Sequence, residues 1–352
     1  MDGGARRAAR AVDALRRGWP VRVTGDDGVL DLLAIESASD AALADFDDGV
    51  ADVLLSGERA VTLKLTNQRA AAAPGPVRLT GAATSVAAGL AIADPALDLA
   101  NPLKGPFRTQ ATGGEAAAMA AMLMARHAGL LPAFFVREAA GGAETACNAA
   151  DVDALLDPTR LHIAARARLP VEASEGAEIV AFRTPEEASD HVALVIGKRD
   201  ASPPVVRLHS ECLTGDVLGS LKCDCGPQLH AALHAMADAP WGVLLYLRQE
   251  GRGIGLVNKL RAYALQDQGY DTVDANLRLG FPVEARDFAI AGRMLELLNI
   301  PRIRLMTNNP EKVARLEREG VEVVERIPLA LPTNKYNEQY LATKRDRTGH
   351  QL

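Results

Sequence analysis

Apolar positions follow two different periods along this chain, and the changes of period mark where helices and strands are expected. In the first half, apolar residues recur at helical spacing in two blocks that end at glycines, and shorter runs between turn residues indicate strands. The predicted helices span 8–17 and 115–127, and the predicted strands span 21–23, 28–35 and 131–136.

The second half shows a denser succession of strand-like and helix-like runs, beginning at residue 178. Strands are predicted over 178–182, 191–197, 204–209, 242–248, 302–306 and 321–326, and helices over 227–237, from 255 onward, and over 288–298, 310–319 and 337–349. Composition changes near Leu169 and Pro170, so we place a domain boundary there. The pattern predicts an α/β (α+β) protein of two domains, 1–137 and 170–352, each a mixed sheet with packed helices, and a connector over 138–169.

Composition narrows the classes of partner. The 352 residues are 48% hydrophobic and 24% charged, values typical of a globular protein. The formal charge of -6 argues against a nucleic-acid or membrane-surface binder, because both partners are polyanions. We expect neither a signal peptide nor a membrane span, since no apolar run is long enough. The clustered cysteines are typical of a reducing compartment, so a cytoplasmic location is expected.

Three of the four cysteines, Cys212, Cys223 and Cys225, lie within one short stretch. Thiolates bind zinc well, and a catalytic zinc typically has three protein ligands and one open position. His209 could instead supply a fourth ligand. A disulfide or a buried apolar cluster is the alternative, although Cys-x-Cys is a strained spacing for a disulfide. The stretch therefore predicts an open zinc site.

A second set of residues favours anion binding. Glycines 251, 253 and 255 surround Arg252 after a predicted strand and before a predicted helix, where backbone N–H groups converge on an anion. Thr307 and Lys312 flank the start of another helix and form a second anion-friendly position. In the C-terminal helix, Lys344, Arg345 and Arg347 are expected to form a solvated face.

The run from His209 to Asp216, the Cys-Asp-Cys-Gly at 223–226 and the residues 249–267 resemble GTP cyclohydrolase II, and the match extends from about 169 to the C-terminus. The resemblance implies a homodimer that uses one zinc ion per subunit and Mg²⁺ on the substrate phosphates. It implies hydrolysis of GTP to a diaminopyrimidine ribosyl phosphate, formate and pyrophosphate, the first step of riboflavin biosynthesis.

The same resemblance assigns roles to individual residues. Glu284, Arg286 and Tyr263 take catalytic positions, although the family acid is usually Asp where this chain has Glu284. Arg286 is either the nucleophile at the α-phosphate or a group that stabilises charge there. Without the resemblance, Glu284 and Arg286 would be interpreted as a surface ion pair. Substrate contacts are implied at Arg207, Leu208, His209, Ser210, Glu211, Gln228, Glu250, Gly251, Arg252, Thr272, Thr307 and Lys312.

The N-terminal half resembles 3,4-dihydroxy-2-butanone 4-phosphate synthase through the order of its elements and the run 128–132. That family holds magnesium in a dense acidic run and carries a Gly-His-Thr-Glu tetrad. This chain has only Asp26, Asp27, Asp31 and Glu36 among apolar residues, and Ala116-Ala-Ala-Met119 replaces the tetrad. We therefore predict a degenerate, inactive domain in which Asp26 and Asp27 are turn residues.

Two other hypotheses remain open from the sequence. In the first, the C-terminal half is a related zinc hydrolase that acts on another purine nucleotide or releases no pyrophosphate. A different class is a nucleotide-binding regulatory protein that does not turn over its ligand. An open metal site argues against this last hypothesis, because a binding protein has no need of one.

Overall fold

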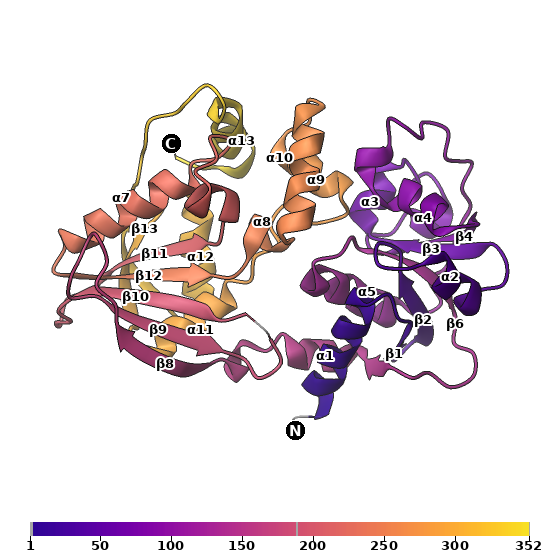
Figure 1. The fold of residues 1–352 in the computed structure, drawn as a ribbon, viewed down its shortest axis with the longest axis horizontal. Helices are drawn as coiled ribbons and strands as arrows, with labels where there is room; N and C mark the ends of the chain where they lie inside the picture. The colour runs from indigo at the N-terminus through magenta and orange to yellow at the C-terminus, as the bar shows by residue number, and fades with distance from the viewer. Residues whose placement is uncertain (1–2, 188, 352) are drawn as a thin grey trace. The chain divides into compact units, whose positions relative to one another are not determined.

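The computed structural model describes residues 3–187 and 189–351. The chain divides into two compact units: Met1–Asp157 with Gly253–Ala285, and Pro158–Arg252 with Arg286–Leu352. Both units combine a mixed sheet with packed helices (Figure 1), which confirms the predicted fold class. No helix in the described part of the chain is long and apolar enough to cross a membrane.

The first unit contains a seven-stranded sheet in the order β5-β4-β3-β6-β2-β1-β7. Neighbouring strands are antiparallel except β1 and β7, which are parallel. Its elements are α1 (Gly3–Arg16), β1 (Val21–Gly25), β2 (Gly28–Ala34), α2 (Asp40–Phe46), β3 (Ala51–Leu55), α3 (Gly57–Thr62), η1 (Arg69–Ala71), β4 (Val77–Ala83), α4 (Val86–Ala93), η2 (Pro95–Leu97), β5 (Thr109–Gln110), α5 (Glu115–Ala128), β6 (Ala133–Glu138), β7 (Ala146–Asn148), α6 (Ala149–Leu155), α9 (Leu256–Asp267) and α10 (Thr272–Arg278).

Both faces of this sheet are buried. Alternation along the strands sends Leu32 and Phe134 to a core shared with α1, α5 and α6, whereas Leu33 and Phe135 enter a second core. The second core also contains Ala262 of α9 and other apolar residues of 253–285. This segment, which lies late in the sequence, is thus part of the first unit.

The second unit contains another seven-stranded sheet, in the order β14-β13-β11-β12-β10-β9-β8. Its elements are η3 (Pro158–Arg160), β8 (His162–Arg168), β9 (Glu178–Arg183), β10 (His191–Gly197), β11 (Val205–Ser210), η4 (Leu213–Val217), α7 (Cys225–Ala237), β12 (Trp241–Leu247), α8 (Glu250–Gly253, at the junction of the units), α11 (Ala289–Leu297), β13 (Arg302–Met306), α12 (Pro310–Arg318), β14 (Glu322–Ile327) and α13 (Glu338–Thr348).

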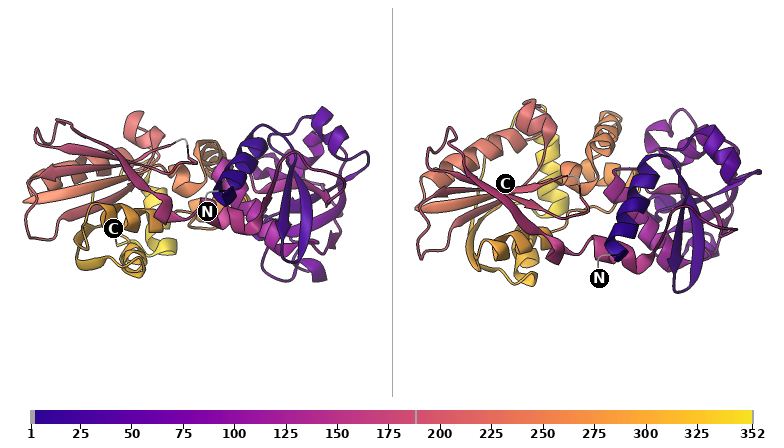
Figure 2. Two further views of the ribbon diagram at one scale, coloured as in Figure 1. Left: turned by 90° about the horizontal axis from the view of Figure 1, so that it is seen from below. Right: turned by 60° about the horizontal axis from the view of Figure 1, so that its bottom comes forward.

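Strands β12, β11, β13 and β14 are mutually parallel, and β10, β9 and β8 extend the sheet in antiparallel fashion. Helix α7 packs on one face of the sheet, and α11 and α12 pack on the other (Figure 1; Figure 2). Because the strands β11, β12 and β13 are parallel, their carboxyl ends meet at one edge, which is where ligands bind in open α/β sheets.

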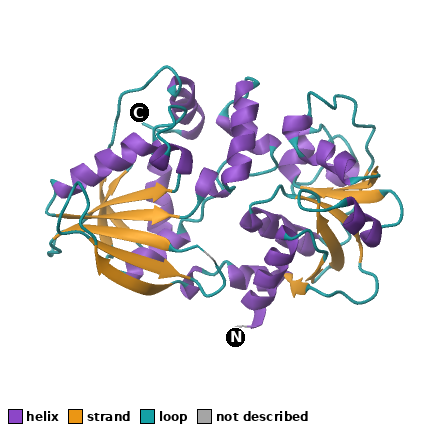
Figure 3. Ribbon diagram, viewed as in Figure 1, coloured by secondary structure: helices purple, strands orange, loops and turns teal. Residues whose placement is uncertain are grey.

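Residues 138–169, which the sequence predicts to be a connector, form helices and strands that belong to both units (Figure 3). Strand β7 pairs with β1, helix α6 packs in the core of the first unit, and β8 pairs with β9. Strand β8 alternates little between apolar and polar residues, and most of its side chains are exposed. The hydrophobic pattern therefore carried no signal for this edge strand.

The packing of 253–285 predicts a difference between two glycine substitutions. Gly269 and Gly280 both have positive φ angles, 97° and 85°. A Cβ at Gly280 would lie 2.6 Å from Ser56 Oγ and 2.9 Å from Pro132 Cγ, whereas a Cβ at Gly269 would meet nothing within 4 Å. We expect Gly269→Ala to lower the free energy of unfolding by about 1 kcal/mol. Gly280→Ala should cost about 1 to 3 kcal/mol more, through overpacking.

Urea unfolding of both full-chain variants measures the difference. Equal stabilities would show that 253–285 does not pack closely against α3 and the start of β6.

Candidate functional site

The candidate site lies at the carboxyl edge of the parallel strands of the second unit. Strand β11 ends at Ser210 and leads into the cysteine loop, and its register pairs Ser210 with Leu247, the last residue of β12. The chain leaves β12 toward Glu250, and it leaves β13 at Met306 toward Thr307. Three loops far apart in sequence thus start from one edge.

The three cysteines of the loop are brought together. The sulfur atoms of Cys212, Cys223 and Cys225 all lie within 4.8 Å of one another, and the Sγ atoms of Cys212 and Cys223 are 3.7 Å apart. None of the three forms a disulfide, which contradicts the disulfide alternative. The backbone N–H of Gly215 donates to Cys212 Sγ at 3.3 Å, and a Cβ at Gly215 would lie 2.8 Å from Cys223 Sγ. The loop is therefore a close-fitting cradle for three sulfur ligands.

The electrostatics of this cluster favour a bound cation. A hydrogen bond with Cys212 raises the pKa of Cys223, and burial raises it further, whereas a hydrogen bond with Cys225 opposes the rise. The pKa of Cys225 is raised well above its ordinary value by the other two thiols and then by burial. Three adjacent thiolates repel one another unless a positive ion lies between them. The donor set fits zinc, a soft enough ion for sulfur ligands, with one position left open.

Asp216 organises the neighbourhood of the cysteines. Its carboxylate lies 3.0 Å from His209 Nε2, accepts from the Tyr246 hydroxyl at 2.9 Å and accepts from the Cys212 backbone N–H at 3.1 Å. The rings of His209 and Tyr246 stack with centroids 5.6 Å apart. Burial and the Asp216 charge raise the pKa of Tyr246, so its hydroxyl stays protonated and donates to Asp216. His209 is engaged by Asp216, and the groups gathered in the cysteine cluster are the three thiols alone among the described residues.

Glu250 joins the cysteine loop to the glycine loop. Its carboxylate accepts from the backbone N–H groups of Leu213 at 2.7 Å and Gly251 at 3.0 Å. Gly251 and Arg252 both have φ of 63°, so this turn places a non-glycine residue in the left-handed region. Nearby, Glu211 pairs with Arg248 at 2.9 Å, and burial raises the pKa of Glu211 despite that cation.

A chain of polar groups runs from Arg207 to the C-terminal helix. Arg207 is buried and donates to Gln228 Oε1 and to the Met306 carbonyl oxygen, while its Nε has no hydrogen-bond partner among the described residues. Burial lowers the pKa of Arg207, although Asp224 and Cys225 oppose this effect. Gln228 donates in turn to Asp224, which lies between two of the cysteines in sequence.

The expectation that Lys344 lies on a solvated face is wrong. Lys344 is largely buried, its Nζ donates to Asp224 Oδ1 at 2.8 Å, and the ammonium lies 4.3 Å from the centroid of the Tyr340 ring. Burial alone would lower the pKa of Lys344, but Tyr340 and Asp224 outweigh it, and the pKa is raised. No local pattern marked this residue, because its partner is 120 positions away.

Further cations gather around the same edge. Burial, followed by the charges of Lys344, Arg252 and Lys312, lowers the pKa of His350 to about 4. Lys312 Nζ donates to the Leu208 carbonyl oxygen at 3.4 Å, and Thr307 Oγ1 accepts from the Asn309 N–H at 3.1 Å. The Leu208 side chain lies in the core, so only its backbone faces the site.

The remaining predicted residues are divided between the units. Arg286 belongs to the second unit, where its positive charge contributes to lowering the pKa of Arg207. Tyr263, Thr272 and Glu284 belong to the first unit with 253–285. There, the Lys259 ammonium lies 5.7 Å from the centroid of the Tyr263 ring, and Thr272 Oγ1 accepts from Gln266 at 3.1 Å.

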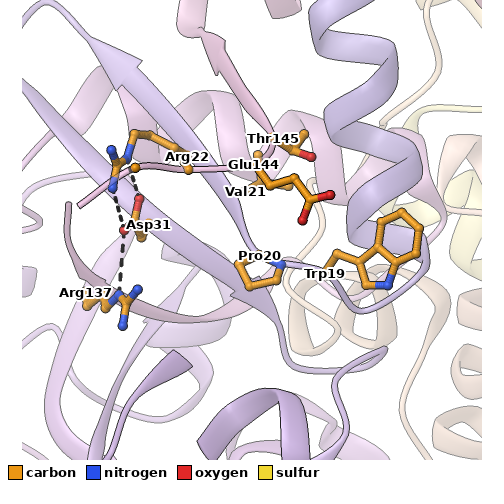
Figure 4. A pocket seen from close by; sticks show the side chains of 10 residues that line it. Trp19, Pro20, Val21, Arg22, Asp31, Arg137, Glu144 and Thr145 are labelled. Carbon is orange, nitrogen blue, oxygen red and sulfur yellow. Dashed lines mark hydrogen bonds and ion pairs between the residues drawn. The ribbon is translucent and has the colours of Figure 1, made fainter. Parts of the chain in front are cut away.

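The carboxylates of the N-terminal half hold structure together. Asp27 accepts from the N–H groups of Glu115 and Ala116 at the start of α5. Asp31 pairs with Arg22 at 2.7 Å and with Arg137 at 3.6 Å beside a cavity of about 410 Å³ (Figure 4). Glu36 pairs with Arg261 at 3.0 Å. Each is committed to a cation or a helix terminus, which leaves no acidic cage among these three residues.

Comparisons with known proteins point to one family. The model of the GTP cyclohydrolase II family matches residues 162–328. A GTP cyclohydrolase-2 of Azospirillum brasilense is 43% identical over 378 aligned positions, which cover 99% of this chain and 95% of that protein. A GTP cyclohydrolase-2 of Histophilus somni is 50% identical over 193 residues, 54% of this chain and 89% of that protein. The riboflavin biosynthesis protein RibBA of Synechocystis sp. is 53% identical over 178 residues, 50% of this chain and 32% of that protein.

The cradle around the thiols predicts how two glycines of the loop respond to an added methyl group. In Gly215→Ala the new Cβ would lie against two sulfur atoms, 2.8 and 3.0 Å away, so the thiols must move apart. We expect zinc affinity to fall at least tenfold. Gly219→Ala is the control for backbone strain in the same loop, because its φ is 66° but a Cβ there meets nothing within 4 Å. Competition with a chromogenic chelator measures both affinities, and equal values would contradict the proposed cradle.

Proposed function

The chain belongs to the GTP cyclohydrolase II family, and we propose that it hydrolyses GTP to a diaminopyrimidine ribosyl phosphate, formate and pyrophosphate as part of riboflavin biosynthesis. The observation that carries this proposal is the triad of thiols, two of them buried, beside Arg207 at the carboxyl edge of parallel strands. A homodimer in the cytoplasm is part of the same proposal.

We propose that Cys212, Cys223 and Cys225 hold one zinc ion. Zinc in such a site supplies Lewis-acid chemistry and activates water for attack on the carbon to be released. Asp216 fixes the loop through the Cys212 N–H and orients His209 and Tyr246. These hydrogen bonds hold the cysteine loop in place around the three thiols that would bind the ion.

The cations of the second unit suit a triphosphate. Arg207 keeps a buried, unpartnered Nε–H, and a buried donor of this kind costs free energy unless an acceptor arrives. Lys312, Arg252 and Arg286 add positive charge near the same edge. We propose that these residues and Mg²⁺ neutralise the substrate phosphates, and that Arg286 stabilises charge at the α-phosphate.

Recognition of the guanine base and proton transfer require other groups. Gln228 and Glu250 present amide and carboxylate edges of the kind that read polar edges of a purine. Tyr263 and Glu284 are proposed for proton transfer, because a phenol and a carboxylate both exchange protons with a leaving nitrogen. The likeness of the N-terminal half to a butanone phosphate synthase stays a prediction, and we propose no synthase activity, since Asp27, Asp31 and Glu36 serve as structural partners.

A single assay tests the activity. Zinc-loaded protein incubated with GTP and Mg²⁺ should yield formate and pyrophosphate, measured by mass spectrometry. Formate without pyrophosphate would favour a related hydrolase, and bound but unchanged GTP would favour a regulatory protein. Cys223→Ser should lose both zinc and turnover, and turnover retained without zinc would refute the metal assignment. A wild-type rate in Glu284→Gln would remove that acid from the mechanism.

The buried ion pair of the C-terminal helix gives a second prediction. Lys344→Gln removes the cation that Asp224 faces, so the chain through Gln228 to Arg207 loses its anchor. We expect KM for GTP to rise about tenfold, equivalent to about 1.4 kcal/mol. Arg345→Gln is the matched control, because Arg345 is exposed and pairs only locally with Asp346. Steady-state kinetics measure KM for GTP in both variants. An equal rise of KM in the two would disprove the role of Lys344.

A further inference from the structure

The segment 253–285 is the part of the family-matched region that packs with the N-terminal half. It carries Tyr263, Thr272 and Glu284. Seven of its apolar residues are buried in one core with residues of β2, β3 and β6. They are Ile254, Ala262, Leu265, Ala275, Leu279, Phe281 and Ala285.

Arg261 fixes helix α9 to two carboxylates of the N-terminal half. Its Nη1 donates to Glu36 Oε1 at 3.0 Å, and its Nε donates to Asp94 Oδ2 at 3.0 Å. The second oxygen of Glu36 accepts from the Leu131 N–H at 2.7 Å. One turn earlier, Asn258 is fully buried, accepts from Arg261 at 2.8 Å and donates to the Gly129 carbonyl oxygen at 3.1 Å. These side chains form a network, which we call the Arg261 clamp.

The far end of the segment is fixed independently. The Arg278 guanidinium lies 4.0 Å from the centroid of the Tyr270 ring and 3.7 Å from Asp98. Asp98 is itself held by the fully buried Arg59 at 2.7 Å. Both helices of the segment are thus tied to the N-terminal half by charged groups as well as by the shared core.

Helical geometry separates the anchoring side chain from the proposed catalytic one. Arg261 and Tyr263 are two residues apart, which is about 200° around an α-helix. Arg261 therefore faces the N-terminal carboxylates while Tyr263 lies on the opposite side, next to Lys259. A rotation or fraying of α9 at the clamp would move Tyr263 directly.

We propose that the N-terminal half is a positioning scaffold for the cyclohydrolase reaction, with Arg261, Glu36 and Asp94 as positioning residues that hold the segment bearing Tyr263, Thr272 and Glu284. This inference rests on the proposed function of those residues. It assigns the degenerate half a task that needs its fold and its carboxylates, and needs no magnesium chemistry.

The test uses the full chain with the isosteric double substitution Glu36→Gln and Asp94→Asn. Hydrogen exchange should become at least tenfold faster for the amides of α9, because the clamp no longer resists local opening. For GTP turnover we expect kcat to fall about tenfold, with KM within about threefold of wild type and zinc content unchanged. Arg261→Lys, which keeps a cation facing both carboxylates, should lose less kcat than the double variant.

Asp151→Asn provides the matched control. Asp151 is also a buried carboxylate of the first unit, paired with Arg7 at 2.7 Å, but it joins α1 to α6 on the other face of the sheet. This variant should keep the exchange of α9 and kcat at wild-type values. An equal fall of kcat in the control would show that the loss of kcat comes from general destabilisation of the first unit, which would overturn the proposal.

Two further outcomes separate the scaffold from the function on which it rests. Faster exchange of α9 with wild-type kcat in the double variant would overturn the scaffold and leave the cyclohydrolase activity standing. If the wild-type protein turns over no GTP, the proposed function fails, and unchanged exchange of α9 in the double variant would overturn the clamp as well.

Discussion

The close spacing of three cysteine sulfur atoms is the constraint on which the candidate site of the second unit depends. The sulfur atoms lie within 4.8 Å of one another, and the pKa values of Cys223 and Cys225 are raised, so thiolates at this spacing would repel one another. Close backbone approach maintains this spacing: a Cβ at Gly226 would lie 2.3 Å from the Gly215 carbonyl oxygen. Asp216 adds three hydrogen bonds from different elements. These contacts hold the loop in place, and a cation bound among the three thiolates would relieve their repulsion.

Charge balance connects this cluster to its surroundings. Arg207 and Lys344 both interact electrostatically with Asp224 and Cys225. Burial of Arg207 would be unfavourable without such partners, since a desolvated cation needs hydrogen bonds. The parallel register of β11 with β12 brings these groups to one edge. The order of the strands therefore determines which charged side chains lie close together, and the loops carry those side chains.

Local sequence predicted most elements and the cysteine cluster, because both depend on spacing within a few residues. Strand β13 and helix α5 follow the expected ranges closely. Lys344 and the assignment of 253–285 to the first unit could not be predicted in this way. Lys344 meets Asp224 across 120 positions, and Arg261 meets Glu36 across 225. A solvated face and a buried ion pair use the same residue types, so only tertiary packing distinguishes them.

The Arg261 clamp joins the region that shorter relatives match to a part of this chain that they do not match. The Histophilus somni protein matches 54% of this chain over 89% of its own length, so it has little chain that could correspond to the N-terminal half. Arg261 lies inside the family-matched range, whereas Glu36 and Asp94 lie outside it. These two carboxylates thus lie in a part of this chain that the family model does not cover. Because the apolar face of α9 shares a core with β2, β3 and β6, removal of that half would expose this face and leave Arg261 without either carboxylate. In this chain 253–285 thus packs with the N-terminal half through a shared core and through the Arg261 clamp.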